Sequence, residues 1–255
     1  MHQGPIVDII VASDGDEPST RACLENVRAC TESGHRVILV APSTAIAGTA
    51  SADDLVVPVE PSTNLAGQLN AGIARASAPF LCTLSSDTRV AGGWLRQMLG
   101  VLAKDKAVGV VGPITSRDRD WQGLRYLSTR WQLDLPVNEI PSADSDQWNR
   151  YLRLRFPRTH VEIDGFLGLF CALARRDVIA AAGPFDEGLA YGTEAEDFAY
   201  RVQRTGAGLA LCLQAYVTRT AGGEALAAPH SAESYQKSLA HLAAKWPDRY
   251  RARAS

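Results

Sequence analysis

Residues 79–94 read PFLCTLSSDTRVAGGW, and this stretch decides the fold. The apolar run Phe80–Leu84 has the length of a buried strand, and the polar residues Ser85–Thr88 cannot continue it into a core. An amphipathic pattern over Trp94–Leu102 then predicts a helix. Open α/β sheets bind ligands at the carboxyl ends of their strands, so Asp87 is a candidate ligand for a divalent cation that would neutralise a phosphorylated substrate. The alternative is a plain strand-to-helix turn in which Asp87 caps the helix or forms an Asx turn.

The composition is that of an ordinary globular protein, with 255 residues of which 46% are hydrophobic and 21% charged. That length fits one large α/β domain or two small ones. A net charge of −2 gives no electrostatic case for binding nucleic acid or an acidic membrane. The five cysteines form no CxxC pair and are expected to be core residues in a reducing compartment. The longest apolar run, Phe166–Ala174, is about half of what a bilayer crossing needs. Met1–Pro5 shows no signal pattern, so we expect a cytoplasmic location.

Apolar runs and helical patterns alternate along the first 113 residues. Strands that alternate with helices at this spacing indicate βαβ units and a mainly parallel sheet. We therefore predict a nucleotide-binding-type half over residues 1–113. Besides Phe80–Leu84, the predicted strands are Val7–Ala12, His35–Val40, Asp54–Val59 and Val108–Pro113, and the predicted helices begin at Pro18 and Asn64.

The segment Thr115–Val161 differs, because it is rich in arginine, tryptophan, aspartate and proline and has little strand pattern. A long segment without regular structure is more often a functional loop or lid than a core element. Its arginines and tryptophans would either bind a polar or sugar-like partner or form a solvated face, and the sequence leaves both open. Beyond it, we predict a strand or buried turn over Asp164–Leu173, a strand over Leu209–Leu213, and helices over Arg175–Ala182, Glu194–Gly206 and Ser234–Trp246.

Four segments occur in order along the chain: Ile9–Asp14; Asn64 with Asn70–Ile73, followed by Leu84–Thr88 and Gly93–Leu95; Gly183–Glu187; and Gly192–Asp197 with Arg201 and Gly206. Together they resemble the family 2 glycosyltransferases of the GT-A fold. The resemblance implies an α/β, Rossmann-like fold in which helices flank a mainly parallel central sheet, with an irregular acceptor-side insertion. It also implies a single GT-A domain over residues 1–255, with a nucleotide-sugar-binding half (1–113) and an acceptor-binding half (114–255).

The resemblance implies three groups of site residues. Asp87 would bind Mg²⁺ or Mn²⁺ as the last residue of the family's Asp-x-Asp metal motif, and a carboxylate shortly before Arg201 would act as the general base. The residues implied to bind the nucleotide sugar are Ala12, Ser13, Asp14, Asn64, Asn70, Ser85, Ser86 and Arg219; those implied to bind the acceptor are Asp186, Glu187, Trp121, Gly165 and Phe166; the candidate bases are Glu194, Glu196 and Asp197.

The sequence departs from the family pattern in its donor half. Ser85 replaces the first aspartate of the metal motif. Ala41–Ser43 replaces the consecutive aspartates that read the nucleobase, a contact that Asp14, or Asp53 and Asp54, could supply instead. Arg219 stands in the region where the family often has a histidine, and would meet the diphosphate as a fixed charge.

A further departure concerns the general base. Ala195 replaces the acid most often assigned this role, which leaves Glu196 and Asp197 as competitors, with Asp197 ahead. On a helix Glu194 and Asp197 would share a face, and their mutual repulsion would raise one pKa. The alternative explanation for these carboxylates is that acidic residues in a first helical turn stabilise the helix dipole.

The resulting prediction is a metal-dependent, inverting hexosyltransferase of the bacterial cytoplasm. It would move a sugar from a UDP-, GDP- or dTDP-linked donor to a hydroxyl of a small-molecule or glycan acceptor. One alternative is a protein of the same fold that binds sugar nucleotide or acceptor without turnover, as Ser85 and Ala41 suggest. A nucleotidyltransferase ranks last, because the acidic Ser13–Asp16 replaces the glycine- and lysine-rich loop that cradles a triphosphate. We expect no nucleic-acid partner and no transmembrane segment, and the sequence allows a homodimer.

Overall fold

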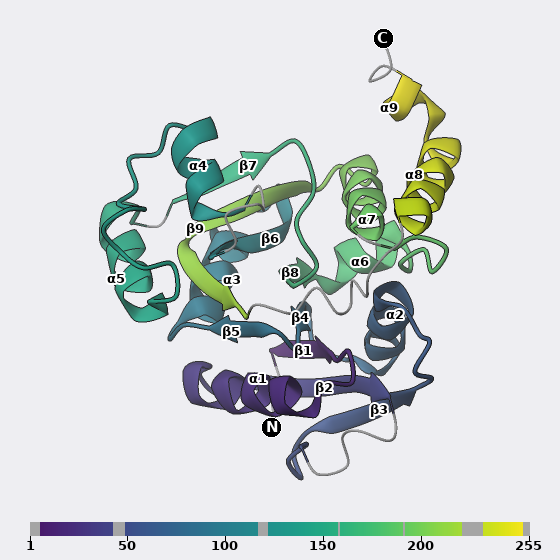
Figure 1. The fold of residues 1–255 in the computed structure, drawn as a ribbon, viewed down its shortest axis with the longest axis horizontal. Coiled ribbons are helices and arrows are strands. Elements are labelled where there is room, and N and C mark those ends of the chain that lie inside the picture. The colour runs from purple at the N-terminus through teal and green to yellow at the C-terminus, as the bar shows by residue number, and fades with distance from the viewer. Residues whose placement is uncertain are drawn as a thin grey trace.

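The computed structural model describes residues 6–42, 49–116, 122–157, 159–190, 192–220 and 232–251 (Figure 1). The strands are β1 (Val7–Ala12), β2 (His35–Pro42), β3 (Leu55–Val59), β4 (Phe80–Ser85), β5 (Thr88–Val90), β6 (Val108–Thr115), β7 (His160–Ile163), β8 (Cys171–Arg175) and β9 (Gly208–Arg219). The helices are α1 (Glu17–Cys30), α2 (Leu65–Arg75), α3 (Trp94–Lys104), α4 (Leu124–Arg130), α5 (Ser145–Arg155), α6 (Arg176–Ala182), α7 (Thr193–Arg204), α8 (Ala232–Lys245) and α9 (Pro247–Arg251).

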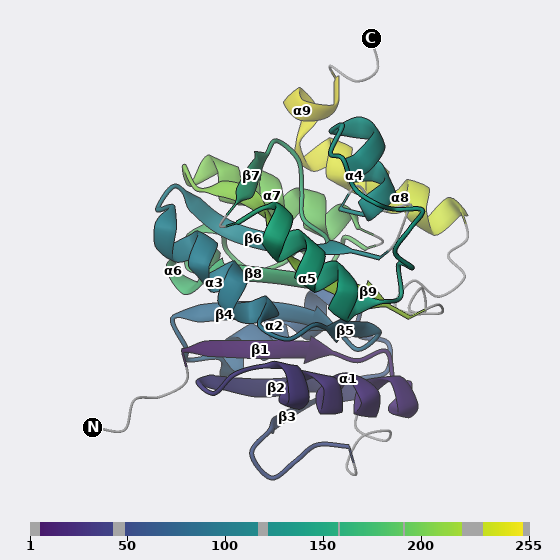
Figure 2. The ribbon, with the colours of Figure 1, turned by 90° about the vertical axis from the view of Figure 1, so that its left-hand side faces the viewer.

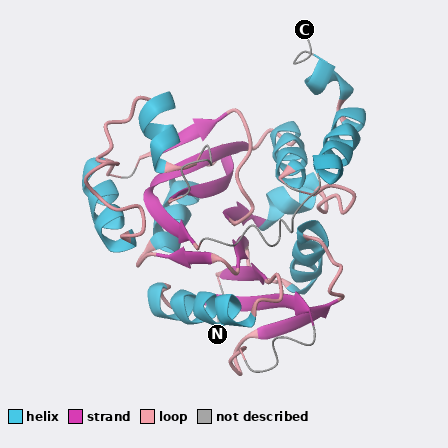
Figure 3. Cartoon of the chain, in the orientation of Figure 1, coloured by secondary structure: helices cyan, strands magenta, loops and turns pink. Residues whose placement is uncertain are grey.

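One mixed sheet runs through both predicted halves of the chain, in the strand order β3-β2-β1-β4-β8-β6-β9-β5, with β7 paired to β9. β1 pairs in parallel with β2 and β4, β2 with β3, and β6 with β9. Antiparallel pairings join β8 to β4 and β6, and join β9 to β5 and β7. The predicted α/β architecture is confirmed (Figure 3), although the sheet is mixed and most of its parallel pairings lie in the predicted nucleotide-binding half.

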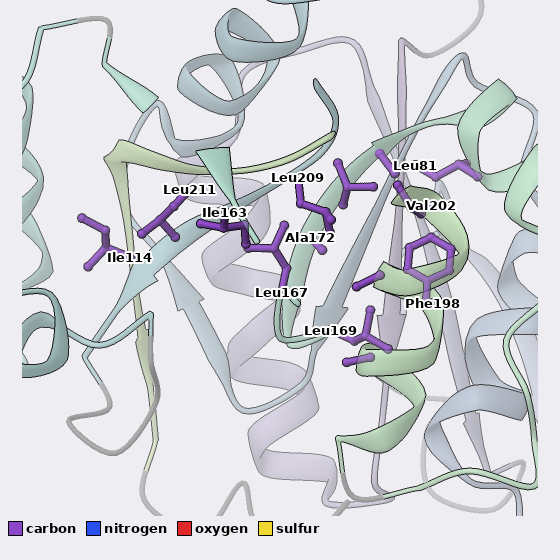
Figure 4. Close-up of a cluster of buried hydrophobic side chains, with 14 of the residues drawn as sticks. Leu81, Ile114, Ile163, Leu167, Leu169, Ala172, Phe198, Val202, Leu209 and Leu211 are labelled. Atoms are coloured by element: carbon purple, nitrogen blue, oxygen red, sulfur yellow. The ribbon is translucent and has the colours of Figure 1, made fainter. Parts of the chain in front are cut away.

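Helices cover both faces of this sheet (Figure 2). Ile9 and Val11 of β1 belong to a buried cluster that includes side chains of α1 and α3, whereas Ile10 belongs to a second cluster with side chains of α2, α6 and α7. This division arises because successive side chains of a strand point to opposite faces. Figure 4 shows part of the second cluster, in which Phe198 of α7 joins Leu81 of β4. None of the helices within the described ranges is long and apolar enough to cross a membrane.

The register between β1 and β4 fixes the position of the candidate site. Ala12, at the end of β1, lies opposite Ser85, at the end of β4. The backbone N–H of Ser86 donates to the carbonyl oxygen of Ala12 at 3.0 Å. The loops that follow the two strands therefore leave the sheet side by side.

A buried carboxylate at the opposite end of β1 secures this register. Asp8 is fully buried and accepts hydrogen bonds from Arg36 Nε (2.8 Å) and Nη2 (3.0 Å). It also accepts from the backbone N–H groups of Ser77 (2.6 Å) and Ala78 (2.8 Å). Asp8 thus joins β1, β2 and the turn before β4. The sequence pattern did not predict this role.

Part of the segment that the sequence predicts to be irregular is helical. α5 begins at the N-cap residue Asp144, whose side chain accepts from the N–H of Gln147 at 2.9 Å. Trp148 and Leu152 lie four residues apart and are both fully buried. The Trp148 ring lies 5.9 Å from that of Tyr216 in β9, so it is a core residue and not an exposed sugar-binding surface. The helix was missed because its apolar face rests on too few positions to give a clear helical period.

Candidate functional site

Polar residues at the carboxyl ends of β1 and β4 form one side of the candidate site. Ser13 is buried, and its hydroxyl lies 2.6 Å from that of Thr20 in α1. The Asp14 carboxylate lies 3.4 Å from the Ser86 hydroxyl. The structure brings together the predicted donor-side residues Ala12, Ser13, Asp14, Ser85 and Ser86.

Asp87 faces Arg219 across the short antiparallel pair of β5 and β9. Arg219 lies opposite Thr88 in the register, and its Nε and Nη2 lie 3.0 Å and 2.8 Å from Asp87 Oδ2. The side chains are 12% (Arg219) and 5% (Asp87) exposed. The guanidinium carbon also lies 4.9 Å from the ring centroid of Phe170. Asp87 therefore has a cationic partner within the chain, and it does not cap α3, whose N-cap residue is Gly93.

The oxygen ligands at this edge fit a hard divalent cation that a phosphorylated ligand would help to hold. Mg²⁺ is commonly bound through one or two carboxylates plus the phosphates of its substrate, and Mn²⁺ prefers similar ligands. Asp87 supplies one buried carboxylate, and the half-buried Asp14 supplies a second carboxylate beside Ser86. Within the described ranges, no group of three or more His, Cys, Asp or Glu residues is placed to hold a metal. An ion at Asp87 would therefore take its remaining ligands from water and from the phosphates of the nucleotide.

Asn64 and Asn70, both predicted to bind the donor, hold the loop between α6 and α7. Asn64 Oδ1 caps α2 by accepting from Gly67 N at 3.0 Å, and its Nδ2 donates to the carbonyl oxygen of Glu187 at 2.8 Å. Asn70 Nδ2 donates to Phe185 O and to Glu187 Oε1, both at 2.9 Å, and Asn70 Oδ1 accepts from Phe185 N at 2.8 Å. These bonds engage both amides within the protein, and a contact of either residue with the donor stays a prediction. The Glu187 carboxylate is likewise held by Asn70.

Lys245, at the end of α8, joins two carboxylates of the predicted acceptor side. Its Nζ lies 2.6 Å from Asp186 Oδ2 and 2.9 Å from Asp197 Oδ1. Asp186 also accepts from Gly188 N at 3.0 Å and lies 3.3 Å from His241 Nε2. Burial by itself would raise the pKa of Asp186, but the hydrogen bonds from Lys245 and Gly188 and the charge of Lys245 hold that pKa below its ordinary value. Asp186 therefore anchors α8 to the acceptor-side loop.

Asp197 is fully buried and surrounded by donors. Its Oδ2 accepts from Arg201 Nε at 2.9 Å, and its Oδ1 accepts from Trp246 Nε1 at 2.8 Å and from Lys245 Nζ at 2.9 Å. A general base must come within hydrogen-bond reach of the hydroxyl group that it deprotonates. Asp197 has no exposed surface and three donors within the protein, which favour a structural role, and the identity of the base stays a prediction.

Glu194 and Glu196 have different surroundings, although both lie in the first turn of α7. The Glu196 carboxylate accepts a hydrogen bond from the Tyr250 hydroxyl at 3.0 Å. Glu194 is buried and accepts from Gly192 N at 2.9 Å. Burial raises the pKa of Glu194, against the opposing effect of the backbone N–H groups of Glu194 and Gly192. A raised carboxyl pKa makes the carboxylate more ready to take up a proton, so Glu194 stays a candidate for the general base.

The direction of the chain places Glu194 toward the same edge of the sheet as Asp87. β6 and β9 are parallel and begin together at Val108 and Gly208. α7 ends at Arg204, shortly before β9 begins, so the helix runs from the carboxyl edge of these strands toward their amino edge. Because β4 and β6 are both antiparallel to β8, they share this direction. The first turn of α7 therefore lies toward the edge at which β4 ends.

A sequence model of glycosyl transferase family 2 matches residues 2–181. The chain belongs to glycosyl transferase family 2. The match includes the edge formed by β1 and β4, and with it Asp87. A comparison with curated proteins found no match.

Two solved structures resemble this family 2 member in fold. GalNAc-T7, crystallised with UDP, GalNAc and Mn²⁺, has a TM-score of 0.60 and 13% sequence identity, over 86% of this chain and 44% of its own. The mannosyltransferase PcManGT from Pyrobaculum calidifontis, in complex with GDP-Man and Mn²⁺, has a TM-score of 0.58 and 18% identity, over 94% of this chain and 65% of its own. This chain therefore spans less than two thirds of either protein. The likeness confirms the predicted GT-A fold.

The remaining acceptor-side predictions fall on the turn before β8 and on the insertion. In this family 2 member, Phe166 is partly buried and packs against the core. Gly165 beside it has open space where a side chain would stand. Trp121 lies outside the described residues. Phe166 therefore has a packing role, and the contribution of Trp121 stays a prediction.

Sequence reasoning missed two cations that organise the site. The Arg89 guanidinium donates to the carbonyl oxygens of Ser86 (2.9 Å), Thr88 (3.0 Å) and Ser19 (3.2 Å), and so holds the loop that contains Asp87. Because Arg89 directly follows Asp87-Thr88 in the sequence, its position could have indicated a role in holding this loop. Lys245 gave no such signal, because its partner Asp186 lies 59 residues before it in the chain.

Proposed function

We propose that this protein transfers a sugar from a nucleotide diphosphate sugar to a hydroxyl group of an acceptor, with inversion at the anomeric carbon. The observation that carries the proposal is the buried Asp87 at the carboxyl end of β4, with Arg219 on one side and the Asp14 carboxylate close to the same loop. Membership of family 2 supports this donor class. So do the two neighbours, whose structures hold UDP with Mn²⁺ and GDP-Man with Mn²⁺.

The β1 and β4 loops would bind the diphosphate part of the donor. Asp87, with Asp14 as a second carboxylate, would hold Mg²⁺ or Mn²⁺, which supplies a Lewis acid for the departing diphosphate when bound. Arg219 would bind diphosphate oxygens through its planar guanidinium. Arg89 keeps the Asp87 loop in place by bonding to its carbonyl groups. These contacts would orient the donor with its sugar toward the acceptor side.

Glu194 would act as the general base. As the acceptor oxygen forms a bond to the anomeric carbon, the bond from that carbon to the diphosphate oxygen breaks, and the acceptor proton passes to the Glu194 carboxylate. Attack from the face opposite the leaving group inverts the configuration. The direction of α7 and the raised pKa of Glu194, caused by burial, support this role.

The loop between α6 and α7 would form the acceptor side. Asn70 fastens it to α2, and Lys245 fastens it to α8. We expect a hexosyl donor and a small-molecule or glycan acceptor. The five cysteines are free thiols, which supports a reducing, cytoplasmic setting.

A second candidate function is binding of a sugar nucleotide or acceptor without turnover. Ala195 favours it, because the resemblance places the usual base at this position. The two functions differ in one result: a binder would take up the donor and never cleave it.

Thermal unfolding with nucleotides tests the donor site. A ligand at 100 times its dissociation constant adds about 2.7 kcal/mol to the free energy of unfolding. For a chain of this size, that corresponds to a rise in Tm on the order of 5–10 °C. We expect such a rise with one of UDP, GDP or dTDP, larger with Mn²⁺ than without it, and lost in Asp87→Asn. If no nucleotide raises the Tm with or without Mn²⁺, the donor half of the proposal fails.

A further inference from the structure

The pair formed by Asp87 and Arg219 is held in place by its backbone as well as by charge. The N–H of Arg219 donates to Ser116 Oγ at 3.1 Å, and the N–H of Thr220 donates to the carbonyl oxygen of Asp87 at 2.9 Å. The guanidinium then places two N–H donors on the same carboxylate oxygen, Asp87 Oδ2, at 2.8 Å and 3.0 Å. Phe170 lies under its plane. Arg219 is therefore positioned on Asp87 in the protein alone, before any ligand binds.

A divalent cation at Asp87 would meet this guanidinium. Mg²⁺ binds oxygen ligands at about 2.0–2.1 Å, so an ion on either oxygen of Asp87 would lie close to the guanidinium that contacts Oδ2. The two cations would then lie within a few ångströms of each other in a site that is almost closed to water. Like charges this close repel strongly where solvent is excluded. The free ion and Arg219 therefore compete for one carboxylate.

A nucleotide diphosphate changes this balance. Its oxygens give the guanidinium a new bidentate partner, and they also give the metal ion the ligands that the described residues do not supply as a cluster. The added negative charge offsets the repulsion between the two cations. Binding of the nucleotide thus removes the obstacle that Arg219 presents to the metal.

We infer that Arg219 is a resident cation that keeps divalent metal off Asp87 until a nucleotide diphosphate arrives, so that metal and nucleotide bind as a coupled pair. The role of the nucleotide in this inference rests on the proposed function. The competition between Arg219 and the metal ion does not. By linkage, each ligand then strengthens the other by the same factor, and couplings of this kind are typically about 5–150-fold.

The test is a titration of the full chain with Mn²⁺, in which the electron paramagnetic resonance signal of the free ion measures how much Mn²⁺ is bound. Without nucleotide, we expect the wild-type chain to bind Mn²⁺ weakly and Arg219→Gln to bind it at least about tenfold more tightly, because the competing charge is gone. Arg219→Lys keeps a charge without the fork and should fall between the two. Adding Asp87→Asn to Arg219→Gln should abolish the tight site. With UDP or GDP, wild-type affinity for Mn²⁺ should rise within the coupling range, and this rise should shrink in Arg219→Gln.

Arg21→Gln is the control, because it removes an equal charge from an exposed position of α1, where Arg21 pairs with Glu17 and not with the Asp87 carboxylate. Its affinity for Mn²⁺ should stay near that of the wild type. The inference is overturned if folded Arg219→Gln binds Mn²⁺ no more tightly than the wild type, if Arg21→Gln gains as much, or if the tight site survives Asp87→Asn. The wild-type titrations remain informative even if Arg219→Gln does not fold. Tight binding of Mn²⁺ by the wild-type chain without nucleotide also overturns the inference. If Arg219 and Mn²⁺ compete for Asp87 but no nucleotide changes the affinity for Mn²⁺, the proposed nucleotide donor is contradicted and the competition at Asp87 is still supported.

Discussion

Replacing Glu194 with glutamine should lower the rate of sugar transfer by about 10²–10⁴-fold, the range that general-base catalysis contributes. Glutamine keeps the size of the side chain and can still accept the hydrogen bond from Gly192 N, but it cannot take a proton. Nucleotide binding should be unchanged. Glu196→Gln is the matched control: its carboxylate is bound by Tyr250, and its loss should have little effect on the rate. Equal losses in both variants would contradict the assignment.

The pH dependence gives a second readout of the same residue. Because burial raises the pKa of Glu194, the wild-type rate should climb to its plateau at a higher pH than an ordinary glutamate would give, and Glu194→Gln should lack this limb. Stability should change in the opposite sense. The carboxyl group stabilises the fold when protonated, and this contribution is lost as the pH rises through the raised pKa. Glu194→Gln should therefore be more stable than the wild type at pH values above that pKa, with the gain disappearing in acid.

Replacing Asp197 with alanine should lower the free energy of unfolding by about 3–5 kcal/mol, the usual result of removing one partner from a buried ion pair. The variant leaves Arg201 and Lys245 without the carboxylate that they share. Urea unfolding measures this directly. Glu233→Ala is the control, because Glu233 pairs with Lys237 on an exposed surface and should cost less than about 1 kcal/mol.

Asp197→Asn separates structure from chemistry. The amide oxygen can still accept from Trp246, so a folded fraction should remain. That fraction should transfer sugar at close to the wild-type rate. If Asp197→Asn is as stable as the wild type but loses sugar transfer by the factor expected for Glu194→Gln, then Asp197 is the base.

Features set by local pattern could be predicted from the sequence. The apolar run before Ser85 gave β4, and the register of parallel strands then brought the β1 and β4 loops together around Asp87. The strands themselves depend on residues near one another in sequence, where periodicity is informative, and the alternation of strands with helices indicates their parallel pairing. The resemblance of the motifs also gave the correct family and fold.

Features set by distant partners could not be predicted. Asn70 and Asp197 occupy positions at which the resemblance suggests contact with substrate, yet their polar groups are taken by Phe185 and by Lys245. Arg219 was expected near the diphosphate, but its bond to Asp87 spans 132 residues and left no pattern in the sequence. Such contacts depend on tertiary packing, which no window of sequence records.

The most direct test of the account is ³¹P nuclear magnetic resonance of the protein with UDP-, GDP- and dTDP-linked hexoses and Mn²⁺, with water or a simple glycoside as the acceptor. The account predicts that the ³¹P spectra show cleavage of one donor to its nucleoside diphosphate, and that ¹H spectra recorded early in the reaction show the inverted anomeric configuration in the sugar product. It also predicts that Asp87→Asn and Glu194→Gln strongly slow the reaction. If folded protein cleaves none of these donors, or cleaves one equally well as Asp87→Asn, the central claim is contradicted.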